Sequence, residues 1–143
     1  MRVYFDTAYV AKCYLNEPTG KEVRKLARRA EGLYSSAWCI AELACVFQRH
    51  IREGSITQDQ GATLRRLFLQ DVRNRVWVLF PVSERLLFRI ESLIGSLPRS
   101  VYVRAGDAIH LVSAKDAGFS EIWSNDRRLC EAAPYFDLAG KTL

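Results

Sequence analysis

Apolar residues in this chain occur either in short continuous runs or in longer stretches with helical spacing. Val3–Phe5, Leu33–Ser35, Val76–Phe80 and Ile122–Ser124 are short apolar runs, and each is expected to form a buried strand. The stretches between these runs repeat apolar residues at intervals of three and four, which is typical of amphipathic helices. Strands that alternate with helices favour an α/β domain whose mostly parallel sheet is covered on both faces.

Residues that favour helix ends delimit the predicted helices. These are expected over about residues 7–15, 19–30, 36–53, 57–72, 83–93, 105–117 and 126–133, and the last residues are expected to add an edge strand. Thr7, Thr19 and Ser83 are placed to begin helices, whereas Gly54 and Gly118 are placed to end them. Residues 1–143 are therefore predicted to form one three-layer α/β/α domain around a sheet of four to five strands.

Composition and charge narrow the class of protein. Among 143 residues, 49% are hydrophobic and 26% charged, and no apolar stretch is long enough to cross a membrane. The charged start of the chain, Met1–Asp6, is unlike a secretory signal, so a cytoplasmic protein with free, buried cysteines is expected. The net charge is +5 and arginine outnumbers lysine, which favours a polyanionic partner.

Four carboxylates stand in apolar or strand-end contexts where acidic residues are uncommon. Asp6 directly follows the first apolar run, and Asp126 follows the last one. Glu42 interrupts an uncharged helical stretch, and Asp107 is the only charge in the first part of its helix. A carboxylate is rarely buried without a partner, because its ionised form loses hydration. Asp107 and Asp126 also have a local explanation, since both fall at the start of a helix.

The predicted topology brings these four acids to one edge of the sheet. In a parallel sheet the carboxyl ends of the strands form the ligand-binding crevice, where Asp6 and Asp126 fall. Glu42 and Asp107 lie near the starts of helices that border this crevice. Four converging acids would repel one another unless cations bound there, and oxygen ligands without a cysteine or histidine cluster favour Mg²⁺ or Mn²⁺ over zinc. Metal-assisted phosphodiester hydrolysis is the chemistry that this arrangement favours.

Four segments resemble, in order, the motifs of the PIN-domain family, and in particular the VapC-type toxins of type II toxin–antitoxin systems. Residues 4–8, Tyr-Phe-Asp-Thr-Ala, resemble the opening Asp-Ser/Thr motif, and Glu42 matches a helix-borne acid about three dozen residues later. Residues 104–111, Arg-Ala-Gly-Asp-Ala-Ile-His-Leu, resemble the Asp-Ala-Ile-His stretch of these toxins. Residues 124–126, Ser-Asn-Asp, resemble their final Thr/Ser-x-Asp motif.

This resemblance implies a PIN fold and an endoribonuclease that depends on Mg²⁺ or Mn²⁺. It also implies a cognate VapB-like antitoxin and a homodimer. Asp6 and Asp107 would bind the metal directly, and Glu42 and Asp126 would complete the site directly or through water. All four acids would thus be both the catalytic and the metal-binding residues.

Neighbouring polar residues are assigned supporting roles by the same resemblance. Thr7 and Ser124, and with them Asn125, would hydrogen-bond the carboxylates or a water on the metal. His110 shares a helix face with Asp107 and is predicted to hydrogen-bond a neighbour, with metal ligation or proton transfer as the alternative.

Basic and aromatic side chains give weaker signals. Arg127 and Arg128 adjoin Asp126 and are expected to contact a substrate phosphate, whereas Arg104 is expected to pair with an acid or with the antitoxin. A second basic group, on one face of the helix over residues 19–30, is explained equally well by RNA contact or by solvation. Large aromatic rings usually lie in the core, so we expect Tyr9, Trp38 and Trp123 there. The cysteines are also expected in the core, and His50 in solvent.

Two other functions remain open from the sequence. The chain could be a housekeeping PIN-type RNA-processing or DNA nuclease, or a non-catalytic nucleic-acid-binding PIN module. A serine hydrolase is excluded because there is no G-x-S-x-G turn. A haloacid-dehalogenase-like phosphatase is excluded because Ala8 stands where its second aspartate would be.

Overall fold

The computed structural model describes residues 1–143, and its strands and helices alternate as the sequence predicts. All paired strands are parallel. The five strands are β1 (Arg2–Tyr4), β2 (Gly32–Ser36), β3 (Trp77–Phe80), β4 (Glu121–Trp123) and β5 (Ala139–Lys141).

The strands form two hydrogen-bonded groups that one parallel bridge joins. β1, β2 and β3 pair in that order, and β4 pairs with β5. Phe5 bridges Trp123, and the Asp6 amide donates to the Trp123 carbonyl at 3.1 Å. The order across the molecule is therefore β3-β2-β1-β4-β5, which confirms the predicted α/β fold. The chain changes direction across the sheet between β1 and β4, and this switch point is where parallel sheets form ligand crevices.

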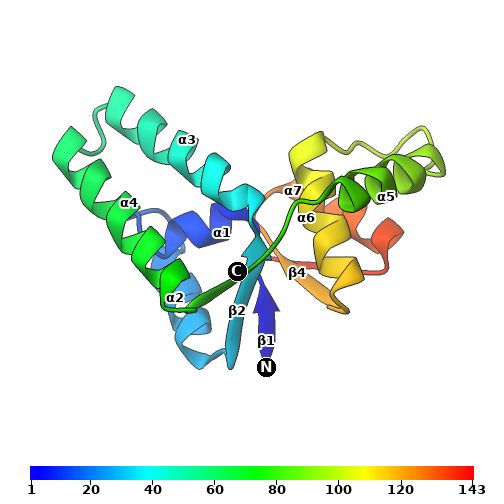
Figure 1. The fold of residues 1–143 in the computed structure, drawn as a ribbon, viewed down its shortest axis with the longest axis horizontal. Helices are drawn as coiled ribbons and strands as arrows, with labels where there is room; N and C mark the ends of the chain where they lie inside the picture. The colour runs from blue at the N-terminus through cyan, green and yellow to red at the C-terminus, as the bar shows by residue number, and fades with distance from the viewer.

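Seven α-helices and one short 3-10 helix, η1, cover the sheet. Their bounds are α1 (Thr7–Lys12), α2 (Gly20–Arg29), α3 (Trp38–Arg52), α4 (Gln58–Arg73), α5 (Glu84–Gly95), α6 (Ala105–Asp116), α7 (Arg127–Ala132) and η1 (Ala133–Phe136). Figure 1 shows the α3–α4 hairpin on one side of the sheet and α5 with α6 on the other. None of the helices combines the length and the apolar character that a membrane span requires.

The helix caps agree with the sequence in part. The Ser83 hydroxyl accepts from the Leu86 amide, as predicted. The prediction that Thr7 caps α1 is wrong, because the Asp6 carboxylate takes that position and accepts from the Tyr9 amide. Thr19 precedes α2 but makes no capping hydrogen bond, because its left-handed backbone, with φ of 62°, differs from the extended backbone of a side-chain cap.

Two apolar cores lie on opposite faces of the sheet, and β1 contributes to both. Val3 and Phe5 pack with Leu43 and Phe47 of α3 in the first core. Tyr4, whose side chain points to the other face, packs in the second core with residues of α6 and α7. This alternation explains why Val3–Phe5 forms a continuous apolar run and why the chain leaving it emerges between the two cores.

Several single-residue predictions about burial are wrong. Trp38 is 38% exposed and Cys45 is exposed, because only one stripe of α3 faces the core although the helix is apolar around most of its circumference. His50 is half-buried rather than solvated, and its Nε2 lies 3.5 Å from the Glu17 carboxylate. All four cysteines are free, as predicted, but only Cys39 is buried, and Cys13 and Cys130 are half-buried. Tyr9 is buried, as predicted, whereas Trp123 is half-buried.

Candidate active site

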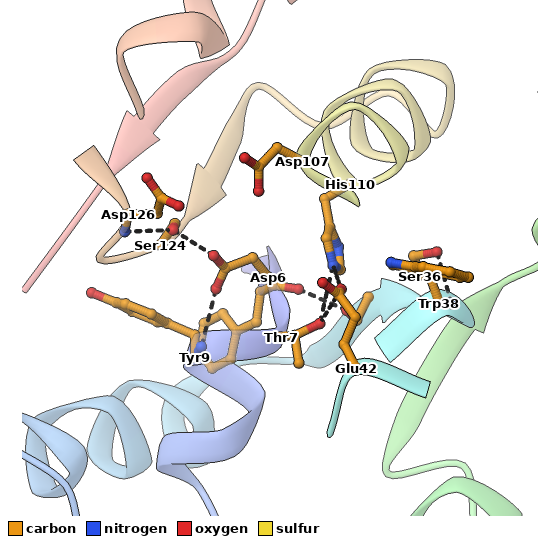
Figure 2. Close-up of polar contacts among 12 residues, drawn as sticks. Asp6, Thr7, Tyr9, Ser36, Trp38, Glu42, Asp107, His110, Ser124 and Asp126 are labelled. Carbon is orange, nitrogen blue, oxygen red and sulfur yellow. Dashed lines mark hydrogen bonds and ion pairs between the residues drawn. The ribbon is translucent and has the colours of Figure 1, made fainter. Parts of the chain in front are cut away.

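The four predicted acids line one cavity at the carboxyl edge of the sheet. Asp6 follows β1, Glu42 comes from α3, Asp107 from α6, and Asp126 directly precedes α7. The cavity has a volume of about 560 Å³ and is also lined by Thr7, Ala8, Trp38, Arg49, Arg104, His110 and Asn125. Figure 2 shows the acidic side chains arranged around Asp6, which caps α1, and Thr7, the first residue of α1.

Asp6 is the most buried of the four acids. One carboxylate oxygen accepts from the Tyr9 amide at 3.0 Å, and the other accepts from the Ser124 hydroxyl. Burial raises the pKa of Asp6 to about 6, although the charge of His110 and these two hydrogen bonds favour the ionised form. The side chain is 5% exposed, so a negative charge here is poorly compensated unless another cation approaches.

Ser124 links Asp6 to the start of α7. Its hydroxyl donates to Asp6 and accepts from the Asp126 amide at 2.9 Å. The Asp126 carboxylate accepts from the amides of Arg128 and Leu129 at 2.9 and 3.3 Å, so it caps α7, as its position in the sequence suggested. The hydrogen bond from Ser124 to the Asp6 carboxylate is the contact predicted for Ser124. The second carboxylate oxygen of Asp126 is left for Arg104.

Arg104 bridges two of the acids. Its Nε donates to Asp107 at 3.2 Å, and its Nη2 donates to Asp126 at 3.0 Å. Burial raises the pKa of Asp107, the neighbouring charge of Asp126 adds to this effect, and Arg104 opposes it. The guanidinium therefore supplies the positive charge that holds these two carboxylates near each other, while its own side chain stays 60% exposed.

Glu42 is held by a hydrogen-bond group from both sides of the sheet. Its Oε1 accepts from the Thr7 hydroxyl at 2.7 Å and lies 2.8 Å from His110 Nε2. Tyr4 contacts the other ring nitrogen, Nδ1, at 3.1 Å. Because a carboxylate only accepts, Nε2 of His110 carries a proton. Burial would raise the pKa of Glu42, but hydrogen bonds from His110 and Thr7 outweigh it, and the pKa stays below its usual range.

The remaining predicted residues differ in whether their side chains contact the four acids. Asn125 lines the cavity, is exposed, and makes no side-chain hydrogen bond to any of the four carboxylates. Arg127 pairs with Glu131 at 2.7 Å, and Arg128 stacks on the Tyr102 ring at 4.2 Å, so neither contacts the four acids through its side chain. His110 is buried and hydrogen-bonded, as predicted.

The sequence analysis missed Glu17, Cys45 and Arg49 of the cavity lining, and also Tyr4 and Gly106, which contact site residues. Tyr4 reads as one more apolar residue of a strand, and nothing local shows that its hydroxyl meets a histidine far along the chain. Gly106 gives a usable signal, because glycine inside a helix often indicates close approach of another group. A Cβ at Gly106 would lie 3.2 Å from Glu42 Oε2 and 3.3 Å from Trp38 Nε1.

The donor set fits a hard divalent cation better than a soft one. Oxygen donors predominate in the lining, because Glu17 and the four predicted acids accompany only one thiol, Cys45, and one imidazole, His110. This suits Mg²⁺ or Mn²⁺. No three acidic, histidine or cysteine side chains are arranged closely enough to share one metal ion. Arg104 and the Ser124 hydroxyl donate to oxygens of Asp107, Asp126 and Asp6. Burial raises the pKa of Asp6, and Arg104 pairs with two of the other acids, so a further cation beside Asp6 would favour its ionised form.

A parallel five-stranded sheet with an acidic cavity at its switch point defines an α/β domain with a candidate cation-binding site. The sequence profile of the PIN domain matches residues 3–134. The chain therefore belongs to the PIN-domain family.

Solved structures share the fold at low sequence identity. VapBC2 from Rickettsia felis, solved with a promoter DNA fragment, has a TM-score of 0.69 and 15% identity, covering 100% of this chain and 99% of that one. FitAcB from Neisseria gonorrhoeae has a TM-score of 0.68 and 18% identity, with coverage of 98% and 96%. VapC20 of Mycobacterium tuberculosis, a toxin that cleaves the sarcin–ricin loop, has a TM-score of 0.67 and 13% identity, with coverage of 96% and 98%. Among curated proteins, no sequence matches this chain.

Proposed function

We propose that this chain is a metal-dependent endoribonuclease and the toxin of a VapBC-type toxin–antitoxin pair. The observation that carries the proposal is the convergence of Asp6, Glu42, Asp107 and Asp126 on one cavity with a single bridging guanidinium. A structural role alone gives no reason to gather four carboxylates, because each added charge raises the cost of burying the others. Membership of the PIN-domain family and the fold shared with VapC20 support the nuclease assignment.

In the proposed site, Asp6 and Asp107 hold Mg²⁺ or Mn²⁺, and Glu42 and Asp126 complete the shell directly or through water. When bound, the metal supplies Lewis-acid chemistry that activates water and stabilises the leaving oxygen of the phosphodiester. Each carboxylate has a neighbour that fixes its orientation, as the hydroxyl of Ser124 does for Asp6.

Three residues beside the acids have distinct tasks in this proposal. Thr7 and His110 hold the Glu42 carboxylate in place through two hydrogen bonds to the same oxygen. Arg104 is exposed enough to exchange its carboxylate partners for a substrate phosphate, because its guanidinium lies at the mouth of the cavity. Asn125, at the rim, is free to hydrogen-bond the substrate.

The proposed partners are RNA, a VapB-like antitoxin and a second copy of the chain. The fold shared with VapBC2 and FitAcB supports a VapB-like antitoxin partner, which would block the acidic cavity, and the proposed location of the chain is the cytoplasm. An excess of five positive charges on the chain is consistent with a polyanionic substrate.

The test is cleavage of a structured RNA by the purified protein with Mg²⁺, with Mn²⁺ and with EDTA. Asp107→Asn is compared with Asp137→Asn, which alters a carboxylate that is 83% exposed and outside the cavity. We expect metal-dependent cleavage by the wild type and the control, and none by Asp107→Asn. Equal cleavage by Asp107→Asn, cleavage in EDTA, or absence of both cleavage and calorimetric metal binding would refute the proposal. Cleavage of DNA in place of RNA would favour a DNA nuclease.

A further inference from the structure

Two further cavities extend the acidic one along the surface of α7. Arg104 and Asp126 of the acidic cavity also line a neighbouring cavity with Arg127, Arg128 and Glu131. A third cavity, of about 320 Å³, contains Arg128 and Glu131 again and adds two tyrosines. We call this third one the tyrosine cavity; it is lined by Ser100, Val101, Tyr102, Arg128, Glu131, Ala132 and Tyr135. The three cavities are contiguous because each shares two residues with the next.

The two tyrosines are exposed and have no hydrogen-bond partner for their hydroxyl groups. Tyr102 is 50% exposed in the segment before α6, and Tyr135 is 52% exposed in η1. The Arg128 guanidinium lies 4.2 Å from the centroid of the Tyr102 ring. Exposed rings beside an arginine are the usual means by which proteins stack unpaired nucleobases, since every base has a π-face.

The charges along this path favour a nucleic acid strand over a protein segment. Arg127 is neutralised by its ion pair with Glu131, whereas Arg128 has no carboxylate partner. An unpaired guanidinium therefore lies between the acidic cavity and the tyrosines, at the position where the backbone of a bound strand would pass. Along this path the acids, the guanidinium and the aromatic rings follow one another in the same order as a cut phosphodiester, a neighbouring phosphate and a base follow one another along a strand.

We propose that the tyrosine cavity binds an unpaired nucleobase of the RNA substrate, adjacent to the bond that is cut, with Arg128 contacting the intervening phosphate. This inference rests on the proposed nuclease function. It makes the substrate class RNA with an unpaired stretch beside the cleavage point, because a base inside a duplex has both faces covered and cannot enter between protein side chains.

The test measures binding apart from cleavage. The Asp107→Asn protein, in Mg²⁺, is titrated against a fluorescein-labelled single-stranded RNA of about 12 nucleotides and against the same strand in a duplex. Tyr102→Ala and Tyr135→Ala are added singly, with Tyr102→Phe and Tyr135→Phe as variants that keep the ring. Phe88→Ala is the matched control, because Phe88 is an exposed aromatic residue on α5 that lines none of the three cavities.

We expect each alanine variant to weaken single-strand binding by about 5-fold to 100-fold, the range for loss of one stacked base. The affinities of both phenylalanine variants and of the Phe88→Ala control for the single strand should stay within about 2-fold of the parent, a change smaller than the loss of one stacked base. The affinity of the tyrosine variants for the duplex should also stay within about 2-fold of the parent. Arg128→Ala should reduce the slope of log affinity against log salt by about 0.7, whereas the tyrosine variants should leave that slope unchanged.

Outcomes that contradict the subsite differ from those that contradict the nuclease. If the wild type cleaves RNA but Tyr102→Ala and Tyr135→Ala bind the single strand as tightly as the parent, the base-binding proposal alone would be wrong. A protein partner would then be the occupant of the tyrosine cavity. An equal loss for single strand and duplex would also overturn it, because a stacking site discriminates between them. If the Asp107→Asn parent bound neither RNA although the wild type cleaved, the base-binding cavity alone would be wrong; absence of both wild-type cleavage and RNA binding would overturn both proposals.

Discussion

Replacing Asp6 by asparagine should stabilise the metal-free protein at neutral pH while it removes activity. The Asp6 carboxylate is buried, and burial raises its pKa from 3.8 to about 6. A carboxyl group whose pKa is higher in the folded than in the unfolded protein favours folding only in its protonated form. The folded state is therefore unpenalised below pH 3.8, and the penalty grows as the pH rises towards 6 and is complete above it.

The size of this effect follows from the pKa. A rise from 3.8 to about 6 corresponds to a free-energy penalty of about 3 kcal/mol for the ionised carboxylate. Asparagine can still accept from the Tyr9 amide and can donate to Ser124, but the Ser124 hydroxyl then loses its acceptor, which costs about 1 kcal/mol. The net gain in unfolding free energy is about 2 kcal/mol, or roughly 6 °C in Tm for a chain of this length.

Urea unfolding in EDTA at pH 7.5 and at pH 4 measures this difference. At pH 4 the penalty falls to less than about 1 kcal/mol, so the advantage of Asp6→Asn should disappear there. Asp137→Asn is the control, because its carboxylate is exposed and its left-handed backbone, with φ of 58°, is one that asparagine adopts readily. A variant that is less stable than the wild type at pH 7.5, or one whose gain is the same at both pH values, would refute the reasoning.

Three further predictions concern the neighbours of the acids. Arg104→Ala removes the cation that bridges two carboxylates, so Mn²⁺ should raise the Tm of this variant more than it raises the Tm of the wild type or of the exposed control Arg66→Ala. Differential scanning fluorimetry measures these shifts, and equal shifts would contradict the prediction. His110→Ala leaves a buried hydroxyl and a carboxylate without their shared partner and should lower the unfolding free energy by roughly 2–4 kcal/mol in urea. Gly106→Ala should lower cleavage with less than about 1 kcal/mol of destabilisation, because its Cβ displaces the Glu42 carboxylate whereas alanine favours the helix; wild-type cleavage rates would contradict this.

Much of the fold was predictable because its signals are local. The strand runs, the helical spacing and the Ser83 cap each depend on residues that are close in sequence. The same holds for Asp126, whose position before a helix predicted its contacts with the first amides of α7. The error at Thr7 is instructive, since both Asp6 and Thr7 can cap a helix, and the choice depends on the strand that fixes the backbone of Asp6 through the Trp123 carbonyl.

The contacts that shape the site were not predictable, because they join residues far apart in sequence. The Ser124 hydroxyl meets Asp6 across 118 positions, and Tyr4 meets His110 across 106. Motifs can name these residues, but they cannot show that Tyr4 lies beneath the histidine. The exposure of Trp38 was equally hidden, because an apolar helix gives the same pattern whether one side of it or all sides are covered.

The position of the site between two cores gives these long-range contacts a common physical role. Glu42 belongs to the helical layer that packs on Val3 and Phe5, whereas His110 belongs to the layer that packs on Tyr4. The hydrogen bond between Glu42 and His110 therefore spans the two layers at the end of the sheet. The one between Asp6 and Ser124 joins the ends of the neighbouring strands β1 and β4. The separation of the four carboxylates is consequently set by how the two layers pack, so a core substitution that shifts either layer should alter cation binding without touching an acid.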